Sequence, residues 1–162
     1  MERIIKLLDG TTLHIKNEFI ELITRYIQKD NIKEAGGVLF GTYAPDDQCY
    51  TLCDISEPTS LDKRSRTGFV RSKKSHQIEI NKKWETSGGI VNYMGEWHTH
   101  PAPNPTPSDI DRELIRQIIR DHSNVYPKVF LAILGSDFSL YIGVADSTVS
   151  YELIFTHCLT GE

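Results

Sequence analysis

The chain has 162 residues and a mass of 18.4 kDa, with 39% hydrophobic and 25% charged residues. A chain of this length is most simply one globular domain over residues 1–162, and its ordinary apolar content excludes an intrinsically disordered protein. The formal net charge of −4 argues against a protein that mainly coats nucleic acid, and no apolar run approaches the ~20 residues of a membrane span.

The chain is expected to reside in a reducing, cytoplasmic compartment. Its N-terminus carries charges at Glu2 and Arg3, where a signal peptide would place its hydrophobic region. Cysteine occurs at positions 49, 53 and 158, an odd number that is too small for a disulfide framework. Cys49 and Cys53 would lie about 13 Å apart in an extended strand, so they cannot form a disulfide with each other.

A hairpin and a helix are predicted for the N-terminal part of the chain. Two short apolar runs, residues 3–8 and 12–15, flank Asp9-Gly10, a dipeptide typical of tight hairpin turns. Asn17 can cap a helix that runs to about residue 28, because apolar residues recur on one face with helical spacing.

Two strands and a basic loop are expected next. Residues 34–41 form a glycine-flanked apolar stretch typical of a buried strand, and a second strand is predicted over residues 48–55. Residues 57–74 have a loop-like pattern. Six basic residues gather there without an acid among them: Lys63, Arg64, Arg66, Arg71, Lys73 and Lys74. Such a run is usually a solvated surface, and its functional interpretation is the docking of an acidic partner or nucleic acid.

The second half alternates between helices and strands. A helix is predicted over residues 75–87, a strand over residues 90–97, and a stiff loop over residues 101–107, which hold four of the seven prolines. Ser108 begins the most regular helix. Its apolar stripe is expected to face the core: Ile110, Leu114, Ile115, Ile118 and Ile119.

Three more strands are predicted, at about residues 128–134, 138–144 and 149–155, and Trp84 and Trp97 are expected in the core. The helices interrupt the strands without alternating regularly with them. The expected fold is therefore a mixed α/β (α+β) layer fold, a mixed β-sheet flanked by helices, and not a Rossmann domain.

One stretch carries a pattern suited to metal chemistry. His98 and His100 lie two residues apart, so their side chains point the same way in an extended chain, and Pro101 favours that extended conformation. Asp111 follows in the first turn of the helix that the proline-rich loop leads into. Two imidazoles and one carboxylate are the ligand set of a catalytic zinc ion that keeps its fourth position for water.

The same stretch resembles a known family of enzymes. Glu34-Ala35-Gly36-Gly37 opening the apolar strand, His98-Thr99-His100-Pro101, and Ser108 three residues before Asp111 are similar to the JAMM motif of the MPN-plus (JAB-domain) zinc metalloproteases. All five motif positions match, and the resemblance covers nearly the whole chain. It implies a single MPN/JAB domain of cytidine-deaminase-like fold.

The resemblance also implies a mechanism. One zinc ion per chain would be held by His98, His100 and Asp111. Glu34 would act as the general base that activates the bound water and then protonates the leaving amine, and Ser108 would donate a hydrogen bond to the oxyanion. The implied reaction hydrolyses the isopeptide bond after the C-terminus of ubiquitin or a ubiquitin-like protein.

Each site residue also has a purely structural interpretation. Ser108 and Asp111 match an N-terminal capping box, which is common before an apolar helix. A glutamate such as Glu34 is most often solvated. The paired histidines have no packing role of their own, and they favour the metal site over these alternatives.

A second, structural zinc site is a weaker hypothesis. Cys49 and Cys53 could combine with His157 and Cys158 near the C-terminus. The alternative is that these thiols are small buried hydrophobic side chains.

Three functions are compatible with the family resemblance. The first is a zinc isopeptidase that acts on a ubiquitin-like conjugate. The second is a non-catalytic MPN scaffold, but such relatives lack ligand residues that this chain has. The third is a nucleic-acid-associated protein of the RadC-like branch, against which the −4 net charge argues.

The compact chain resembles the stand-alone JAB proteins of bacteria, which act beside E1-like and E2-like enzymes or beside sulfur-carrier proteins. The sequence of residues 95–101 is most similar to that of JAB deconjugases of antiphage CBASS-type operons. A conjugated protein substrate and partner enzymes of the same pathway are therefore expected, with no membrane partner and no nucleic acid. The preferred use of the basic segment is contact with the substrate.

Overall fold

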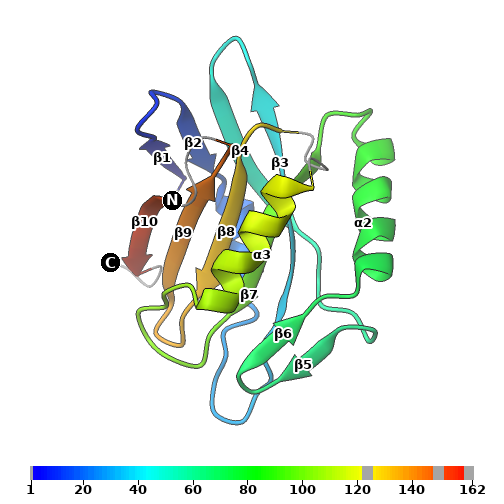
Figure 1. Ribbon diagram of the computed structural model, residues 1–162, viewed down its shortest axis with the longest axis vertical. Coiled ribbons are helices and arrows are strands. Elements are labelled where there is room, and N and C mark those ends of the chain that lie inside the picture. The colour runs from blue at the N-terminus through cyan, green and yellow to red at the C-terminus, as the bar shows by residue number, and fades with distance from the viewer. Residues whose placement is uncertain (1, 122–125, 148–151, 159–162) are drawn as a thin grey trace.

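The computed structural model describes residues 2–121, 126–147 and 152–158, the last range by its backbone alone. Eight strands form one curled sheet in the order β1-β2-β4-β3-β7-β8-β9-β10 (Figure 1). Their bounds are β1 (Arg3–Lys6), β2 (Thr12–Ile15), β3 (Gly36–Ala44), β4 (Cys49–Ile55), β7 (Asn92–Thr99), β8 (Val129–Leu134), β9 (Ser139–Ala145) and β10 (Glu152–Cys158). A separate two-stranded sheet, called the hairpin below, consists of β5 (Lys63–Ser65) and β6 (Gly68–Val70). The helices are α1 (Asn17–Thr24), α2 (Lys73–Thr86) and α3 (Asp109–Arg120).

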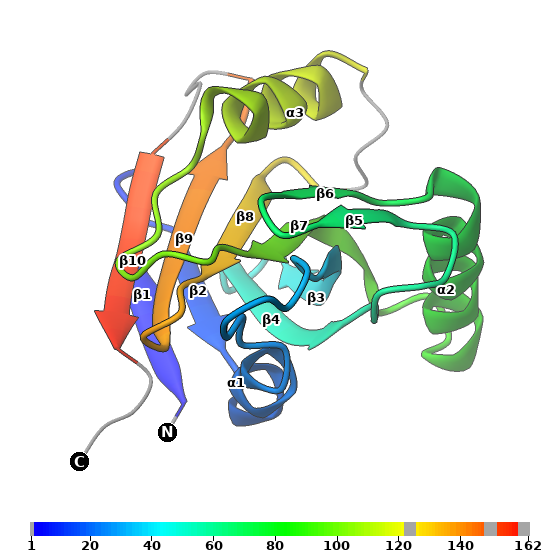
Figure 2. The same cartoon turned by 90° about the horizontal axis from the view of Figure 1, so that it is seen from below.

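The large sheet is mixed, as the sequence predicts. β2 pairs with β4 and β7 pairs with β8 in parallel, and the remaining neighbours are antiparallel. The sheet curls so that its two edge strands, β1 and β10, come to the same side of the molecule (Figures 1 and 2). In the described part of the chain, none of the helices has the length and apolar content needed to cross a membrane.

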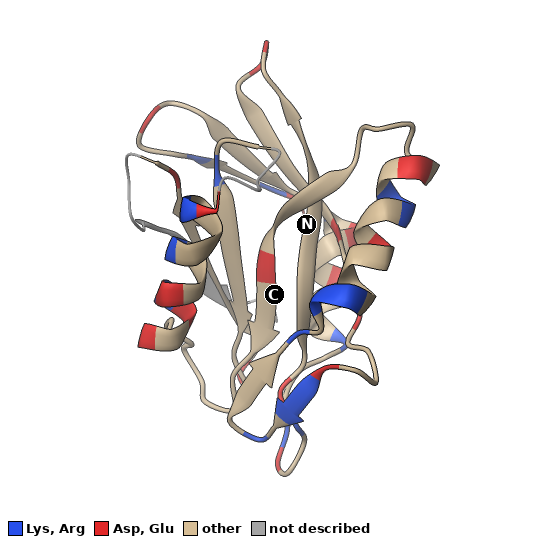
Figure 3. Ribbon diagram, turned by 45° about the vertical axis from the view of Figure 1, so that its right-hand side comes forward, with Lys and Arg blue, Asp and Glu red and all other residues tan. Residues whose placement is uncertain are grey.

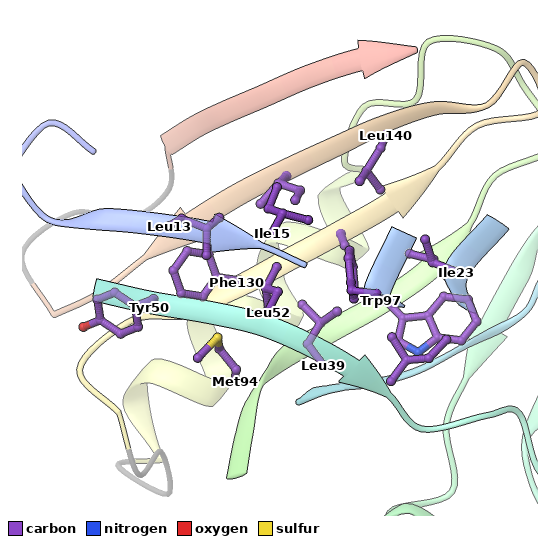
Figure 4. Packing of buried hydrophobic residues seen from close by; sticks show 14 of the residues in the cluster. Leu13, Ile15, Ile23, Leu39, Tyr50, Leu52, Met94, Trp97, Phe130 and Leu140 are labelled. Atoms are coloured by element: carbon purple, nitrogen blue, oxygen red, sulfur yellow. The ribbon is translucent and has the colours of Figure 1, made fainter. Parts of the chain in front are cut away.

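The central strand β8 is buried on both faces, and its side chains divide between two cores. Phe130 points into the larger core, which α1 covers with Phe19 and Ile23. Leu131 points the other way, toward Ile115 of α3. Figure 4 shows the larger core, where side chains from β2, β4, β7 and β8 converge. A strand buried on both faces carries a nearly continuous apolar run, which explains the sequence of β8.

Several predicted boundaries are wrong. Asn17 is the first residue of α1 and not its cap, and the helix ends at Thr24 instead of residue 28. The predicted loop over residues 57–74 contains the hairpin and the start of α2. The hairpin strands have only three residues each, too few for an alternating pattern to identify them.

Part of the predicted core is also exposed. Ile115 is buried as expected, but Ile110 and Leu114 are 82% and 40% exposed. Trp97 is buried and Trp84 is 45% exposed near the end of α2. Helical periodicity thus identified the face of α3 but not how much of it the sheet covers.

A buried lysine joins the two ends of the sheet. Lys128 forms ion pairs of 2.7 Å with Asp9 in the β1–β2 turn and 2.9 Å with Asp146 after β9. The hydrogen bond from Lys128 lowers the pKa of Asp9 from 3.8 to about 2. The charged form of Asp9 is therefore stabilised in the folded protein.

We expect Asp9→Asn to lower the free energy of unfolding at neutral pH by at most about 1 kcal/mol, because the Asp9 side chain is 48% exposed and solvent screens the pair. A depressed carboxyl pKa contributes stability above the unfolded value, and this stability is lost as pH falls through the folded value of about 2. Urea unfolding from pH 7 down to pH 2 should show the two proteins converging. Asp47→Asn, in an exposed turn, serves as the control.

Candidate metal centre

β7 places the first histidine at the centre of the sheet. His98 pairs with Gly36 of β3 on one side and with Ile133 of β8 on the other, and it is 7% exposed. The next residue but one, His100, continues this line because its backbone N–H donates to the carbonyl of Leu134 (2.9 Å). Both imidazoles therefore leave the backbone on the same face, as predicted for an extended chain.

The proline-rich loop returns the chain to this face. Pro105 and Pro107 are buried, and the backbone N–H of Ser136 donates to the carbonyl of Ala102 (3.1 Å). The loop ends at Ser108, the N-cap of α3. Asp111 occupies the third position of the helix and faces the histidines.

Three ligand-type side chains converge at this point. His98 Nε2 lies 3.0 Å from His100 Nε2 and 3.3 Å from Asp111 Oδ1, and His100 Nε2 lies 3.6 Å from Asp111 Oδ2. Two atoms bound about 2.0–2.1 Å from a tetrahedral zinc ion are separated by about 3.3–3.4 Å. One ligand atom from each of the three side chains lies within 4.8 Å of the other two, so the three side chains are close enough to share such an ion. Among the side chains that the structure describes, this is the one cluster able to hold a metal.

The capping box and the cluster share one carboxylate. Ser108 N–H donates to Asp111 Oδ2 (2.7 Å), and the Ser108 hydroxyl accepts from Asp111 N–H (3.1 Å). Burial raises the pKa of Asp111, but hydrogen bonds from His100 and His98 lower it by more. The resulting pKa lies well below the ordinary range of an aspartate. Asp111 is therefore a carboxylate at any working pH, with Oδ1 left to bind a cation.

Glu34 lies at the edge of the same cluster. It precedes β3, and the pairing of Ala35 with Thr99 (2.9 and 3.0 Å) aligns it with the strand that carries both histidines. Glu34 is 5% exposed, and within the described residues its carboxylate forms no hydrogen bond. Burial raises its pKa; the charges of His98 and His100 oppose this shift and that of Asp111 adds to it.

The hairpin fixes the backbone of Glu34. Glu34 N–H donates to the carbonyl of Ser65 (2.8 Å), and Arg64 Nε donates to the carbonyl of Glu34 (2.6 Å). Gln28 in turn donates to the carbonyl of Arg66 (2.6 Å). The segment predicted as a basic loop thus packs against Glu34 and forms one side of the site.

A buried hydrogen-bond network anchors the segment that carries the hairpin. His76 of α2 contacts Ser56 after β4 through Nδ1 (2.7 Å) and Asp62 before the hairpin through Nε2 (2.9 Å). Asp62 also accepts backbone hydrogen bonds from Thr59 (2.6 Å) and Ser72 (2.7 Å). His76 is fully buried, so it belongs to the protein interior.

Sequence analysis missed a second polar group beside the histidines. Glu96 shares its face of β7 with His98, is 4% exposed, and pairs with Arg71 and Tyr93. The i, i+2 spacing of Glu96 and His98 was the available signal. Two residues of the hypothetical cysteine zinc site, His157 and Cys158, have side chains outside the described residues; Cys49 and Cys53 are free thiols.

Comparison with known proteins decides the family. The family described as prokaryotic homologs of the JAB domain matches residues 16–153. The chain belongs to this prokaryotic JAB-domain family. The JAB chain is 32% identical over 133 residues to a CD-NTase/cGAS isopeptidase of Pseudomonas aeruginosa, which covers 82% of each protein. It is 29% identical over 121 residues to a probable metalloprotease of Sinorhizobium fredii (74% of this chain, 73% of that protein).

The fold of the JAB chain is shared with a protein from Desulfitobacterium hafniense whose structure was determined in solution. The TM-score is 0.60 at 18% identity, over 86% of this chain and 87% of the other. Together with the family match over residues 16–153, this similarity confirms the predicted mixed α/β fold of JAB type.

The contact between β3 and the hairpin requires a glycine. A Cβ atom at Gly36 would lie 2.5 Å from the ring of Phe69 in β6 and 2.7 Å from the carbonyl oxygen of Trp97. We expect Gly36→Ala to destabilise the protein by about 1–3 kcal/mol and to loosen the hairpin. Gly68→Ala is the control, because its Cβ would meet only the end of the Ser65 side chain at 3.1 Å.

Urea unfolding and trypsin cleavage within residues 63–74 measure the two effects. Gly36→Ala should unfold at lower urea and be cut faster than the wild type, whereas Gly68→Ala should behave like the wild type. Equal behaviour of the two variants would contradict the close contact.

Proposed function

We propose that the chain is a zinc-dependent isopeptidase that hydrolyses the amide bond joining a conjugated protein to its target. The observation that carries the proposal is the convergence of His98, His100 and Asp111 beside the buried carboxylate of Glu34. A metal-binding site next to a carboxylate with raised pKa is the arrangement that hydrolysis of an amide by activated water requires.

His98, His100 and Asp111 would hold the metal. Their nitrogen and oxygen atoms lie 3.0–3.6 Å from one another, close enough for one cation to contact all three side chains. Two imidazole nitrogens and one carboxylate oxygen suit zinc, and three protein ligands leave a position for reactants. When bound, zinc polarises the scissile carbonyl and lowers the pKa of water.

Glu34 would act as the general base. Its carboxylate has no competing hydrogen bond in the described chain, and burial makes it a stronger base than an exposed glutamate. Glu34 takes a proton from the attacking water and delivers it to the leaving amine. Ser65 and Arg64 hold the backbone of Glu34, and this restricts the motion of its carboxylate.

Ser108 would stabilise the oxyanion. Its hydroxyl accepts from Asp111 N–H through a lone pair, so the hydroxyl proton remains available for donation. Ser108 is exposed at the N-terminus of α3, where the helix dipole also favours negative charge. The capping and catalytic roles are thus compatible in one side chain.

The relatives suggest the substrate class. The Pseudomonas aeruginosa relative is named for isopeptidase action on CD-NTase/cGAS. We infer that this chain acts on isopeptide-linked conjugates of a cGAS-like nucleotidyltransferase, beside E1-like and E2-like enzymes in bacterial antiviral defence. The free thiols of Cys49 and Cys53 are in keeping with a reducing cytoplasm.

Charge around the site suggests how the conjugate docks. Figure 3 shows basic residues on β5 and at the start of α2, and acidic residues at the start of α3. The two sides of the site therefore differ in sign. We propose that an acidic surface of the conjugate faces the hairpin.

The deciding experiment measures zinc and cleavage together. The wild-type protein should bind one zinc ion per chain by elemental analysis and should cleave an isopeptide-linked CD-NTase conjugate. His98→Ala should lose both, because it removes a ligand. Glu34→Gln should keep the metal and lose cleavage, since the base is not a ligand.

His14→Ala is the matched control, because His14 contacts Glu2 far from the cluster. It should retain metal and activity. A wild-type protein without metal after zinc is supplied would contradict the proposal and favour a non-catalytic scaffold. Loss of metal in Glu34→Gln would contradict the role of Glu34.

Variants of Ser108 separate its two roles. Ser108→Ala should raise the activation barrier by about 2.7–4 kcal/mol if the hydroxyl serves the oxyanion, and lower stability by about 1 kcal/mol through loss of the cap. Ser108→Asp keeps a capping oxygen but donates no proton, so it should be stable and inactive. Ser108→Thr should be stable and active. If Ser108→Asp cleaves at the wild-type rate, the hydroxyl has only the capping role.

A further inference from the structure

A buried carboxylate lies beside the metal cluster without belonging to it. Glu96 is two residues before His98 in β7, so both side chains leave the same face of the sheet, about 7 Å apart along the strand. Glu96 is 4% exposed. A carboxylate so deeply buried must be compensated by several hydrogen bonds.

Three hydrogen bonds provide this compensation. Arg71 Nε lies 2.8 Å from Glu96 Oε2 and 3.0 Å from Oε1, and the Tyr93 hydroxyl donates to Oε1 over 3.1 Å. Arg71 follows β6 directly and precedes α2, so the network joins the end of the hairpin to the strand that carries the histidines. The arginine is therefore held in one orientation.

Stability alone does not account for this network. A buried ion pair contributes little net free energy relative to apolar side chains of similar size, because both charges must be desolvated. The pair is better explained by the hydrogen-bond donors of Arg71 that it leaves available to a ligand. Glu96 engages the Nε of Arg71, and the Tyr93 hydroxyl forms a hydrogen bond with the arginine as well, which leaves the other N–H groups of the two terminal nitrogens.

Part of the Arg71 side chain is accessible to solvent. The Arg71 side chain is 21% exposed, and none of its nitrogens is buried without a partner in the described chain. The result is a planar donor group, fixed from behind by Glu96, on the face of the sheet where the cluster lies. Donors fixed in this way bind an acceptor at low entropic cost.

We propose that Arg71 is a substrate-binding residue whose terminal N–H groups hold a main-chain carbonyl oxygen of the extended substrate chain, two or three residues from the scissile bond. The proposal rests on the isopeptidase function above. The distance follows from β7 itself, since Glu96 is about 7 Å from His98 and an extended chain advances about 3.3 Å per residue.

The charge of the network selects this ligand. Glu96 already neutralises Arg71, so a substrate carboxylate would bring a second negative charge to a neutral pair. A carbonyl oxygen needs only the hydrogen-bond donors. Recognition of the main chain would position any extended segment, whatever its side chains.

Model isopeptides test the proposal. In one series, alanine chains of two, four or six residues end at the scissile carbonyl on a lysine amine; in a second, the lysine lies in peptides of the same lengths. For the metal-loaded wild type, kcat/KM should rise with length in one series. Arg71→Lys keeps the charge beside Glu96 but lacks the planar donor group, so it should lose roughly 10- to 100-fold on six-residue chains and little on two-residue chains.

Arg116→Lys, an exposed arginine of α3, is the control and should match the wild type. If Arg71→Lys does not fold, Glu96→Gln provides the same test, because it releases the arginine from its fixed orientation. An equal loss at all lengths, or none, would mean that the network is only a structural clamp and would overturn the proposal.

Two further results separate the remaining explanations. A loss that shrinks at high salt, or that grows when glutamate replaces alanine in the chain, would assign Arg71 to a carboxylate and overturn the carbonyl assignment. If the metal-loaded wild type cleaves neither the peptides nor the protein conjugate, the isopeptidase function itself fails. If the wild type cleaves these substrates but the effect of Arg71→Lys does not depend on chain length, only the proposed role of Arg71 is rejected.

Discussion

The pairing of β7 with β3 and β8 is the constraint on which the whole site depends. Backbone hydrogen bonds on both sides fix the direction of every side chain in β7, so Trp97 enters the core while Glu96 and His98 face outward. A bulge before Gly95 sets this alternation. Gly95 has φ of +150°, and a Cβ there would lie 1.9 Å from the carbonyl oxygen of Phe130. A side chain at this position would displace the strand that carries the first histidine.

The second constraint is that the residues that cap α3 also line the candidate metal site. Asp111 caps α3 with one oxygen and offers the other to the cluster, and Ser108 accepts a helical N–H while keeping its own proton. A helix that folds correctly therefore delivers both groups in position. This coupling explains how a capping box can include one candidate metal ligand, Asp111, so the structural and functional interpretations of Ser108-x-x-Asp111 do not compete.

The site was more predictable from sequence than its surroundings. His98 and His100 are separated by one residue, and Asp111 follows a stiff loop, so the local sequence pattern was sufficient to predict that their side chains come together. Glu34 could be placed only through resemblance, because its approach depends on the pairing of β3 with β7 over 64 residues. The hairpin escaped prediction because its short strands are held by contacts with Gly36 and Glu34, which no local pattern contains. The exposure of Ile110 shows the same limit.

These distant contacts decide how a substrate would meet the site. Asp62 and His76 anchor the two ends of the hairpin segment in the protein interior, and Arg71 ties its exit to Glu96. The hairpin is held at Asp62 before β5, at Glu34 beside it and at Arg71 after β6. It therefore presents its basic residues on a preformed surface. Binding then loses little conformational entropy, so the free energy of contact with a conjugate remains available for aligning the scissile bond with Glu34 and the metal cluster.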